Sequence, residues 1–92
     1  PVPIITSPTS GSTYRAGESI ALAGSATDAE DGALAASQLT WKIDFHHDTH
    51  THPGMAPTSG NTGQYEVPRI GETSSNVFFR VYLTATDSQG LT

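Results

Sequence analysis

Apolar and polar residues alternate with a period of two along much of this chain, which is the pattern of half-buried β-strands. The alternation is clearest in residues 19–27, 39–46 and 77–86. Shorter strands are predicted over residues 3–6, where proline favours an edge position, and over residues 63–67. Because no long segment repeats with the period of a helix, the pattern predicts an all-β protein.

The same alternation predicts which residues meet in the core. The strands over 39–46 and 77–86 are expected to be antiparallel neighbours, with His46 near Phe78. The predicted core faces carry Ile20, Leu22, Gly24 and Ala26, then Leu39, Trp41, Ile43 and Phe45, and finally Val77, Phe79, Val81, Leu83 and Ala85.

Two long connections separate these strands. Residues 28–37 form a predicted acidic loop with at most one turn of helix, and residues 47–62 are predicted to be a long irregular segment. Short strands with regular turn signals favour an antiparallel β-sandwich. Only Leu91 and Thr92 follow the turn at residues 88–90, so a further edge strand either is missing or is replaced by another closure of the sheet.

Composition narrows the function classes. The 92 residues are expected to form one domain, residues 1–92, which reads as a module excised from a larger protein. The net charge of −5, with only four Lys and Arg, argues against nucleic-acid binding and against attraction to anionic membranes. No cysteine is present, which excludes thiolate metal sites and cysteine nucleophiles.

Three segments resemble the PKD-like and bacterial immunoglobulin-like family. They are residues 26–32 (ATDAEDG), 41–45 (WKIDF) and 83–90 (LTATDSQG). The family's usual Gly-Asp-Gly turn is replaced here by His46-His47-Asp48, which marks this module as unusual. The resemblance implies an immunoglobulin-like (PKD-like) antiparallel β-sandwich.

The histidine-rich string at residues 44–53 also resembles modules appended to secreted bacterial carbohydrate-active proteins and to sugar-dehydrogenase-like propellers. This resemblance implies a secreted, periplasmic or cell-surface location and a non-catalytic accessory role. The implied partners are the neighbouring domains of the parent protein and, as an alternative, a polysaccharide. A plain structural spacer that binds no ligand is the second alternative.

All four histidines lie in one short segment, and they predict a transition-metal site. Imidazole is the commonest protein ligand for Zn, Cu and Ni. In an extended chain, residues two apart share a face, so alternate residues from Asp44 to His52 would line one side. The alternative is a polar loop in which histidines and threonines hydrogen-bond one another. The candidate ligands are His46, His47, Asp48, His50 and His52.

Two acidic loops offer a second candidate site. In an immunoglobulin-like order these loops lie at the same end of the sandwich, where carboxylates suit Ca²⁺. The alternative, which we favour, is that the aspartates cap turns, because the dense alternating carboxylates of a strong calcium loop are absent. The residues concerned are Asp28, Glu30, Asp31 and Asp87.

An outer face of the last strand offers a third candidate. Phe78, Arg80 and Tyr82 alternate on this face and are candidates for stacking on a sugar. In the alternative, the segment 47–62 covers them and Arg80 pairs with Asp44. Catalysis is not expected, because the chain has no nucleophile elbow and no glycine-rich phosphate loop.

Overall fold

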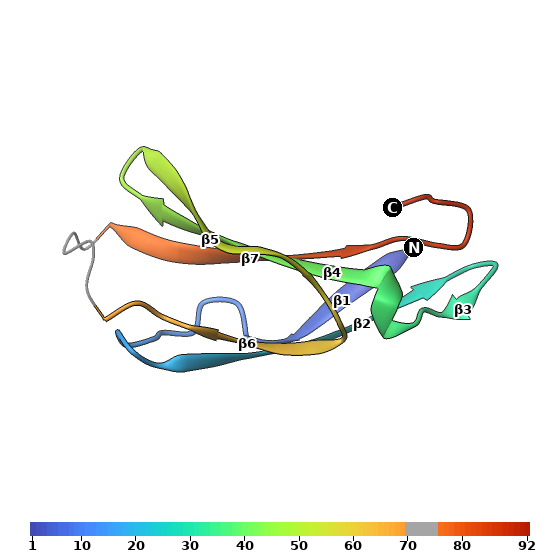
Figure 1. Cartoon of the computed structure of the whole chain (residues 1–92), viewed down its shortest axis with the longest axis horizontal. Helices are drawn as coiled ribbons and strands as arrows, with labels where there is room; N and C mark the ends of the chain where they lie inside the picture. Colours follow the sequence, from blue (N-terminus) through green and yellow to red (C-terminus); the bar gives the residue numbers. More distant parts are fainter. Residues whose placement is uncertain (70–75) are drawn as a thin grey trace.

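The computed structural model describes residues 1–69 and 76–92, and it is all-β. Alternating apolar residues form strands that bury one face each, so the chain builds two antiparallel sheets facing one another (Figure 1). The strands are β1 (Val2–Ser7), β2 (Ser19–Asp28), β3 (Gly32–Ala33), β4 (Leu39–His47), β5 (His50–Ser59), β6 (Thr62–Glu66) and β7 (Val77–Ala85). A 3-10 turn, η1 (Ala36–Gln38), lies between β3 and β4.

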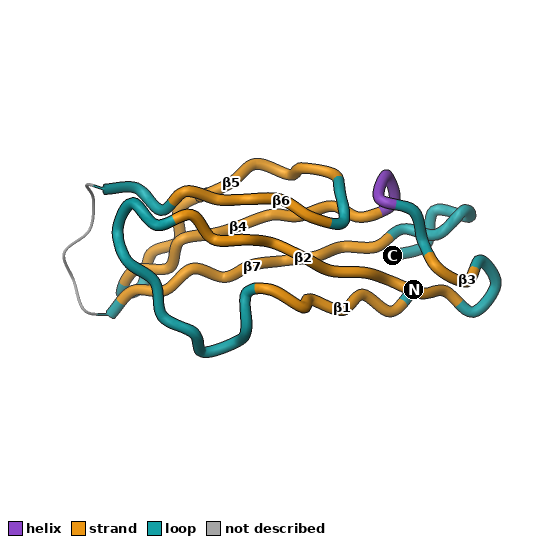
Figure 2. Tube along the Cα trace, turned by 90° about the horizontal axis from the view of Figure 1, so that it is seen from below, coloured by secondary structure: helices purple, strands orange, loops and turns teal. Residues whose placement is uncertain are grey.

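The two sheets differ in the strands that form them. In one sheet β2 pairs with β1, with the short β3 and with β6; in the other, the order is β5-β4-β7 (Figure 2). The molecule is elongated, with extents of 46 × 23 × 20 Å. The β4–β5 hairpin lies at one end, and the β2–β3 loop lies at the other (Figure 1).

The core lies between the sheets and follows the predicted apolar faces. Leu22, Trp41 and Ile43 are buried together near the middle, with Phe79 and Val81 packed against them. A second buried group, Ala26, Leu39 and Ala85, continues the core toward the β3 end. The Trp41 indole Nε1 donates a hydrogen bond of 2.7 Å to the Gly60 carbonyl oxygen, which satisfies its buried polar group.

The predicted pairing of the strands over residues 39–46 and 77–86 is confirmed. β4 and β7 are antiparallel neighbours, with His46 opposite Phe78 and Asp44 opposite Arg80. The sandwich-like all-β architecture is therefore the part of the fold that the alternation alone predicts.

The prediction of an irregular segment over residues 47–62 is wrong. Most of it forms β5, a ten-residue strand that pairs antiparallel with β4, and β6 begins at Thr62. Pro53 and Pro57 favour a loop when read alone, but an edge strand with one free side tolerates proline. Register shifts beside Ile43 absorb the irregularity in this pairing.

The acidic loop is also more ordered than predicted. Gly32 and Ala33 form the short strand β3 against the end of β2, while the expected turn of helix is present as η1. Within residues 1–69 and 76–92, β7 pairs only with β4, so its other edge is open there. No helix in that part of the chain is long and apolar enough to cross a membrane.

Candidate functional site

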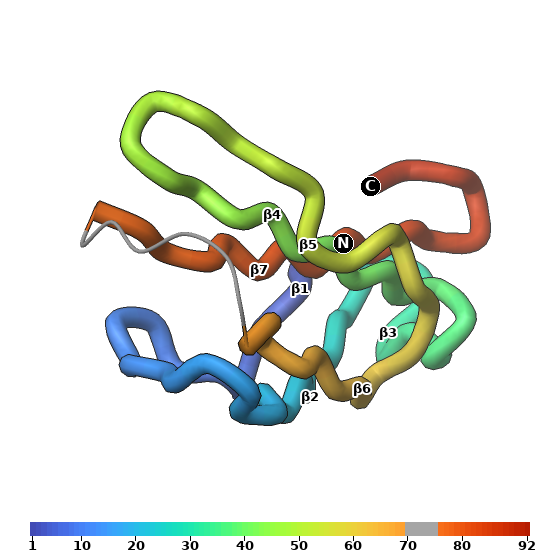
Figure 3. The backbone as a smooth tube through the Cα atoms, turned by 60° about the vertical axis from the view of Figure 1, so that its left-hand side comes forward, coloured from blue at the N-terminus to red at the C-terminus, as the bar shows by residue number. Residues whose placement is uncertain are grey.

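The four histidines lie at the tip of the β4–β5 hairpin. β4 ends at His47 and β5 begins at His50, so two residues make the turn. Asp48 in this turn has φ of 50°, a left-handed conformation that Asp tolerates better than most residues. The resulting register sets His50 opposite His47 and His52 opposite Phe45. Figure 3 shows how far this hairpin projects from the body of the molecule.

Three of the imidazoles share one face of the hairpin. Residues directly opposite in an antiparallel pair, and residues two apart in a strand, point to the same side. The ring centroids of His47 and His50 are 5.4 Å apart, and those of His47 and His52 are 5.3 Å apart. The His50 and His52 centroids are 6.5 Å apart. We call His47, His50 and His52 the three-histidine cluster.

His46 lies on the opposite face and does not belong to this cluster. Its ring stacks on Phe78, with centroids 4.5 Å apart and an interplanar angle of 10°. Its Nδ1 lies 3.5 Å from the Thr51 hydroxyl, and its buried Nε2 has no hydrogen-bond partner among the described residues.

The predicted ligand face is therefore wrong in its membership. An extended chain from Asp44 to His52 would put His46 beside His50 and His52, but the turn at Asp48 reverses the chain. The reversal moves His50 and His52 onto the face of His47 and leaves His46 behind. Of the five candidate ligands, His47, His50 and His52 therefore lie together and His46 does not.

Asp48 is the carboxylate nearest the three-histidine cluster. Its Oδ2 lies 3.5 Å from His47 Nδ1. A carboxylate that contacts one ring nitrogen fixes the orientation of the imidazole and leaves the other nitrogen to bind a ligand. Asp48 is thus placed to orient His47.

The imidazole rings of the three-histidine cluster are as far apart as in a metal site, but they are not oriented toward a common ion. Imidazole nitrogens bind Zn²⁺ at about 2.0–2.1 Å in a tetrahedral arrangement, which separates ring centroids by about 5 Å. The rings of His47 and His52 are nearly parallel, with an interplanar angle of 14°, so their nitrogens do not converge. As the side chains stand, no group of three or more potential ligands within residues 1–69 and 76–92 surrounds a common metal position.

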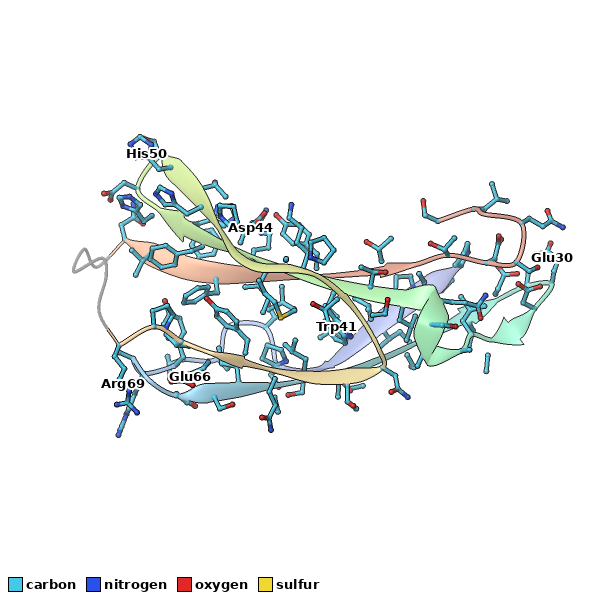
Figure 4. The ribbon with its side chains drawn as sticks, in the orientation of Figure 1. Glu30, Trp41, Asp44, His50, Glu66 and Arg69 are labelled. Atoms are coloured by element: carbon cyan, nitrogen blue, oxygen red, sulfur yellow. The ribbon has the colours of Figure 1, made fainter. Side chains whose placement is uncertain are left out.

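Two rings of the three-histidine cluster are free to rotate. His50 and His52 are exposed, and Figure 4 shows His50 at the outermost point of the hairpin. Exposed side chains exchange between rotamers at low cost, whereas the half-buried His47 is held by Phe45 and Asp48. The cluster therefore combines one held imidazole with two exposed ones.

The aromatic candidates lie on the outer face of β7. Phe78 is 45% exposed, Arg80 is exposed and Tyr82 is half-buried. The Arg80 guanidinium lies over the Phe78 ring at 5.6 Å, and Lys42 lies over the Tyr82 ring at 5.3 Å. In the alternative prediction, residues 47–62 cover this face. In the structure Phe78 remains accessible to solvent.

Asp44 is buried on this outer face. Its expected partner was Arg80, which is opposite it in register, but the ion pair in the structure joins Asp44 Oδ2 to Lys42 Nζ at 3.3 Å. Residues two apart on one strand share a face, which explains why Lys42 reaches this carboxylate.

The acidic candidates lie together at the far end of the molecule, where Figure 4 shows Glu30. Asp28 Oδ2 accepts hydrogen bonds from the backbone N–H groups of Glu30 and Asp31, both at 3.1 Å. Asp87 Oδ1 accepts from the N–H groups of Gln89 and Leu91, both at 2.9 Å. Aspartates that already cap turns favour the turn-capping alternative over a calcium site.

Asp31 joins the two acidic loops. Its carboxylate accepts hydrogen bonds from the Ser88 backbone N–H at 2.8 Å and from the Ser88 hydroxyl at 3.0 Å. Burial pushes the pKa of Asp28 up, but the N–H donors from Asp31 and Glu30, together with the N-terminal amine of Pro1 at 3.3 Å, bring the pKa below its ordinary value. The predicted meeting of these loops is confirmed.

Sequence reasoning missed the aromatic residues behind the histidine hairpin. Tyr14 and Tyr65 lie on the side of the sheet that faces β7. Their rings pack edge-on against the Phe79 ring, with centroids 5.0 Å away for Tyr14 and 5.5 Å away for Tyr65. Neither tyrosine belongs to a motif, so no local signal identifies them. They become neighbours of Phe45 and His52 only through the packing of the two sheets.

Comparison of the chain with family models, with curated proteins and with solved structures gives no match.

Proposed function

We propose that this chain is a non-catalytic accessory module of a secreted bacterial multidomain protein, and that its β4–β5 hairpin binds a transition-metal ion. The proposed ligands are His47, His50 and His52, with Asp48 orienting His47. Zn²⁺, Cu²⁺ and Ni²⁺ are the ions that such an imidazole set prefers.

We assign the module to the immunoglobulin-like or PKD-like sandwiches. Support comes from the strand pairing, since such a fold joins its second strand to its fifth and its third strand to its sixth in chain order. If the two-residue β3 is set aside, the pairs β2–β6 and β4–β7 match this scheme, and β5 matches an added strand beside the third. Trp41, buried on β4, matches the tryptophan of the third strand in immunoglobulin domains.

The observation that carries the metal proposal is the spacing of three imidazoles on one face. Centroid separations of 5.3 to 6.5 Å match or slightly exceed those of imidazoles that share a tetrahedral ion. The hairpin supplies this spacing through backbone pairing alone. A metal therefore needs to reorder only the exposed rings of His50 and His52.

A thermal melt of the chelator-treated domain, with and without Zn²⁺, Cu²⁺ or Ni²⁺, tests this proposal. An ion at a hundredfold excess over its dissociation constant adds about 2.7 kcal/mol of stability. For a domain of this size, that shift corresponds to a rise in Tm on the order of 10 °C. The rise should disappear in the His50→Ala, His52→Ala double variant.

His46 provides the matched control, because it belongs to the same segment but lies on the other face. The His46→Gln variant should keep the full rise in Tm. An equal rise in the double variant, or its loss in His46→Gln, would contradict the proposed ligand set.

A carbohydrate-binding role is a second candidate, favoured by the exposure of Phe78. Exposed apolar patches often mark binding sites. Arg80 and Tyr82 lie on the same face as the exposed Phe78. Affinity electrophoresis in gels that contain soluble polysaccharides tests it. Retardation of the wild type but not of Phe78→Ala supports the role, and equal migration of both in every gel rejects it.

A further inference from the structure

A groove runs along the edge of β7 that faces away from β4. It has a volume of about 860 Å³. The loop of residues 8–13 rises toward β7 from the other layer and lines one side of the groove (Figure 1). Neighbouring side chains of a strand point to opposite faces, yet four consecutive residues of β7 line this groove, so it follows the backbone edge of the strand. These residues are Phe78, Phe79, Arg80 and Val81.

The backbone of β7 directs alternate N–H and C=O groups into this groove. Thr86 donates its N–H to the Gln38 carbonyl oxygen at 3.0 Å, so Thr86 faces the β4 side. β4 and β7 pair in one constant register along their length. Because the bonding groups of an antiparallel strand alternate in direction from residue to residue, the even-numbered residues of β7 bond to β4. Phe79 and Val81 therefore direct their N–H and C=O groups to the groove.

One backbone hydrogen bond already forms along this edge. Asp87, the next odd-numbered residue after β7, donates its N–H to the Leu91 carbonyl oxygen at 2.9 Å. The direction of this bond agrees with the alternation counted from Thr86. The chain doubles back at the turn, so the contact is antiparallel, and a strand at Phe79 and Val81 would extend it in the same sense.

Apolar side chains border the groove beside these backbone groups. Ile5 is 37% exposed and Phe78 is 45% exposed, which is unusual for large apolar residues in a domain of this size. Ile20 lines the groove from the opposite sheet and packs against the core. A ligand in the groove thus gains hydrogen bonds along one side and apolar burial along another.

β7 also lacks the features that protect the other long edge strands from further pairing. β1 carries Pro3, and β5 carries Pro53 and Pro57, which have no N–H to donate. The nine residues of β7 read VFFRVYLTA, with no proline and with one charge, at Arg80. An edge strand of this composition is suited to pairing with another strand.

We propose that the β7 edge binds an extended polypeptide segment from outside residues 1–92 as an added antiparallel strand. A row of alternating N–H and C=O groups is matched by another backbone, so it selects a polypeptide over a sugar or an ion. Residues opposite Phe79 and Val81 share their face and point into the sandwich, so the segment carries apolar side chains at alternate positions. The metal proposal uses none of these residues.

A peptide of alternating valine and threonine, matched to the nine residues of β7 and flanked by lysines, tests this proposal. Its valines lie opposite Phe79 and Val81 and direct their N–H groups to β7, while its threonines direct theirs away. N-methyl groups on the threonine nitrogens therefore leave binding intact and stop the peptide from pairing with itself. The matched control carries the methyl groups on the valine nitrogens.

Hydrogen exchange of the chelator-treated, ¹⁵N-labelled domain is the measurement. With the first peptide in excess, the amides of Phe79 and Val81 should gain at least about tenfold in protection. Those of Arg80 and Tyr82, which already bond to β4, should change much less. The control peptide should protect none of them.

Two variants of β1 locate the bound peptide. Ile5 lines the groove, so Ile5→Ser removes apolar contact and should weaken binding about fivefold. Ile4 is also exposed but points to the opposite face of β1, so Ile4→Ser should bind the peptide as the wild type does.

Three results would overturn the proposal. These are no gain in protection with the first peptide, an equal gain with the control peptide, and protection of Phe79 and Val81 in the free domain that rises with protein concentration. The last result would assign the edge to a second copy of this chain. The outcome does not depend on the three-histidine cluster, because no metal is present in this experiment.

Discussion

At the scale of single residues, Gly24 shows how closely the two sheets approach. A Cβ at this position would lie 2.7 Å from the Ile4 carbonyl oxygen and 2.7 Å from Leu83 Cδ2, with Trp41 at 3.1 Å. Neighbours on three sides leave a methyl group no space. The alternation of β2 predicts that Gly24 faces the core, but only the packing shows why no side chain fits there.

The Gly24→Ala substitution should therefore destabilise the protein. Overpacking of this kind costs about 1–3 kcal/mol, because backbone and side chains must shift to admit the extra atom. Urea unfolding, followed by Trp41 fluorescence, measures the loss. Gly63→Ala is the matched control, since a Cβ there meets Leu22 only at 3.6 Å or beyond, and its free energy of unfolding should change little. Equal effects of the two substitutions would contradict this account.

The histidines illustrate what residue-level reasoning misses. Their number and their proximity in sequence predict a metal site, and three of the four rings do lie close together at the hairpin tip. Which histidines share a face depends on where the chain turns, and the turn at Asp48 carries none of the usual glycine signals. A one-residue change in that turn would shift β5 against β4 and move His50 and His52 to the face of His46, so membership of the cluster is fixed by the register.

At the scale of elements, the long buried strands were predictable and the exposed one was not. β2, β4 and β7 each bury an apolar stripe, and a buried stripe leaves its period in the sequence. β5 is exposed along nearly its whole length, so no apolar stripe marks it. Backbone hydrogen bonds pair β5 with β4. Because every residue type can form such bonds, the pattern of apolar and polar residues does not reveal this pairing.

The turn of the β4–β5 hairpin controls the three-histidine cluster. Asp48→Val places a β-branched residue at φ of 50°, which it adopts poorly, so the hairpin tip should fray. Asp48→Asn keeps a residue that tolerates this conformation. Hydrogen exchange of the backbone amides of His47 and His50 measures the difference.

We expect protection of these amides to fall at least about tenfold in Asp48→Val, since a strained residue at such a position costs about 1–3 kcal/mol. Affinity for Zn²⁺ should fall in parallel, because His47 and His50 would no longer be held opposite one another. Asp48→Asn should retain the protection. Protection that survives in both variants would mean that the turn does not hold the hairpin tip together.

At the scale of the whole molecule, the two ends carry different chemistry. The histidine hairpin lies at one end, and the acidic loops lie at the other, as the positions of His50 and Glu30 show (Figure 4). The acidic end holds two loops together through Asp31 and Ser88, so its carboxylates serve structure. The metal proposal therefore concerns one end of the molecule, and the pH dependence expected from Asp28 concerns the other.

The lowered pKa of Asp28 gives that pH dependence its sign. A carboxyl whose pKa is lower in the folded chain than its ordinary value of 3.8 stabilises the fold above that value. The contribution is lost as the pH falls through the folded-state pKa, because the protonated group no longer attracts the N–H groups of Glu30 and Asp31 as strongly. The free energy of unfolding should therefore decline below about pH 4.

Urea unfolding of the wild type and of Asp28→Asn, at about pH 5 and again at about pH 2.5, isolates this contribution. Asparagine keeps an oxygen that accepts the two N–H bonds but has no proton to gain, so the variant should start less stable and lose less stability on acidification. Asp28 closes its loop onto the end of β2, and Asp31 in the same loop reaches Ser88. Loosening there should therefore lower the stability of the whole sandwich. A variant that loses as much stability as the wild type over this range would show that the acid sensitivity lies in other groups.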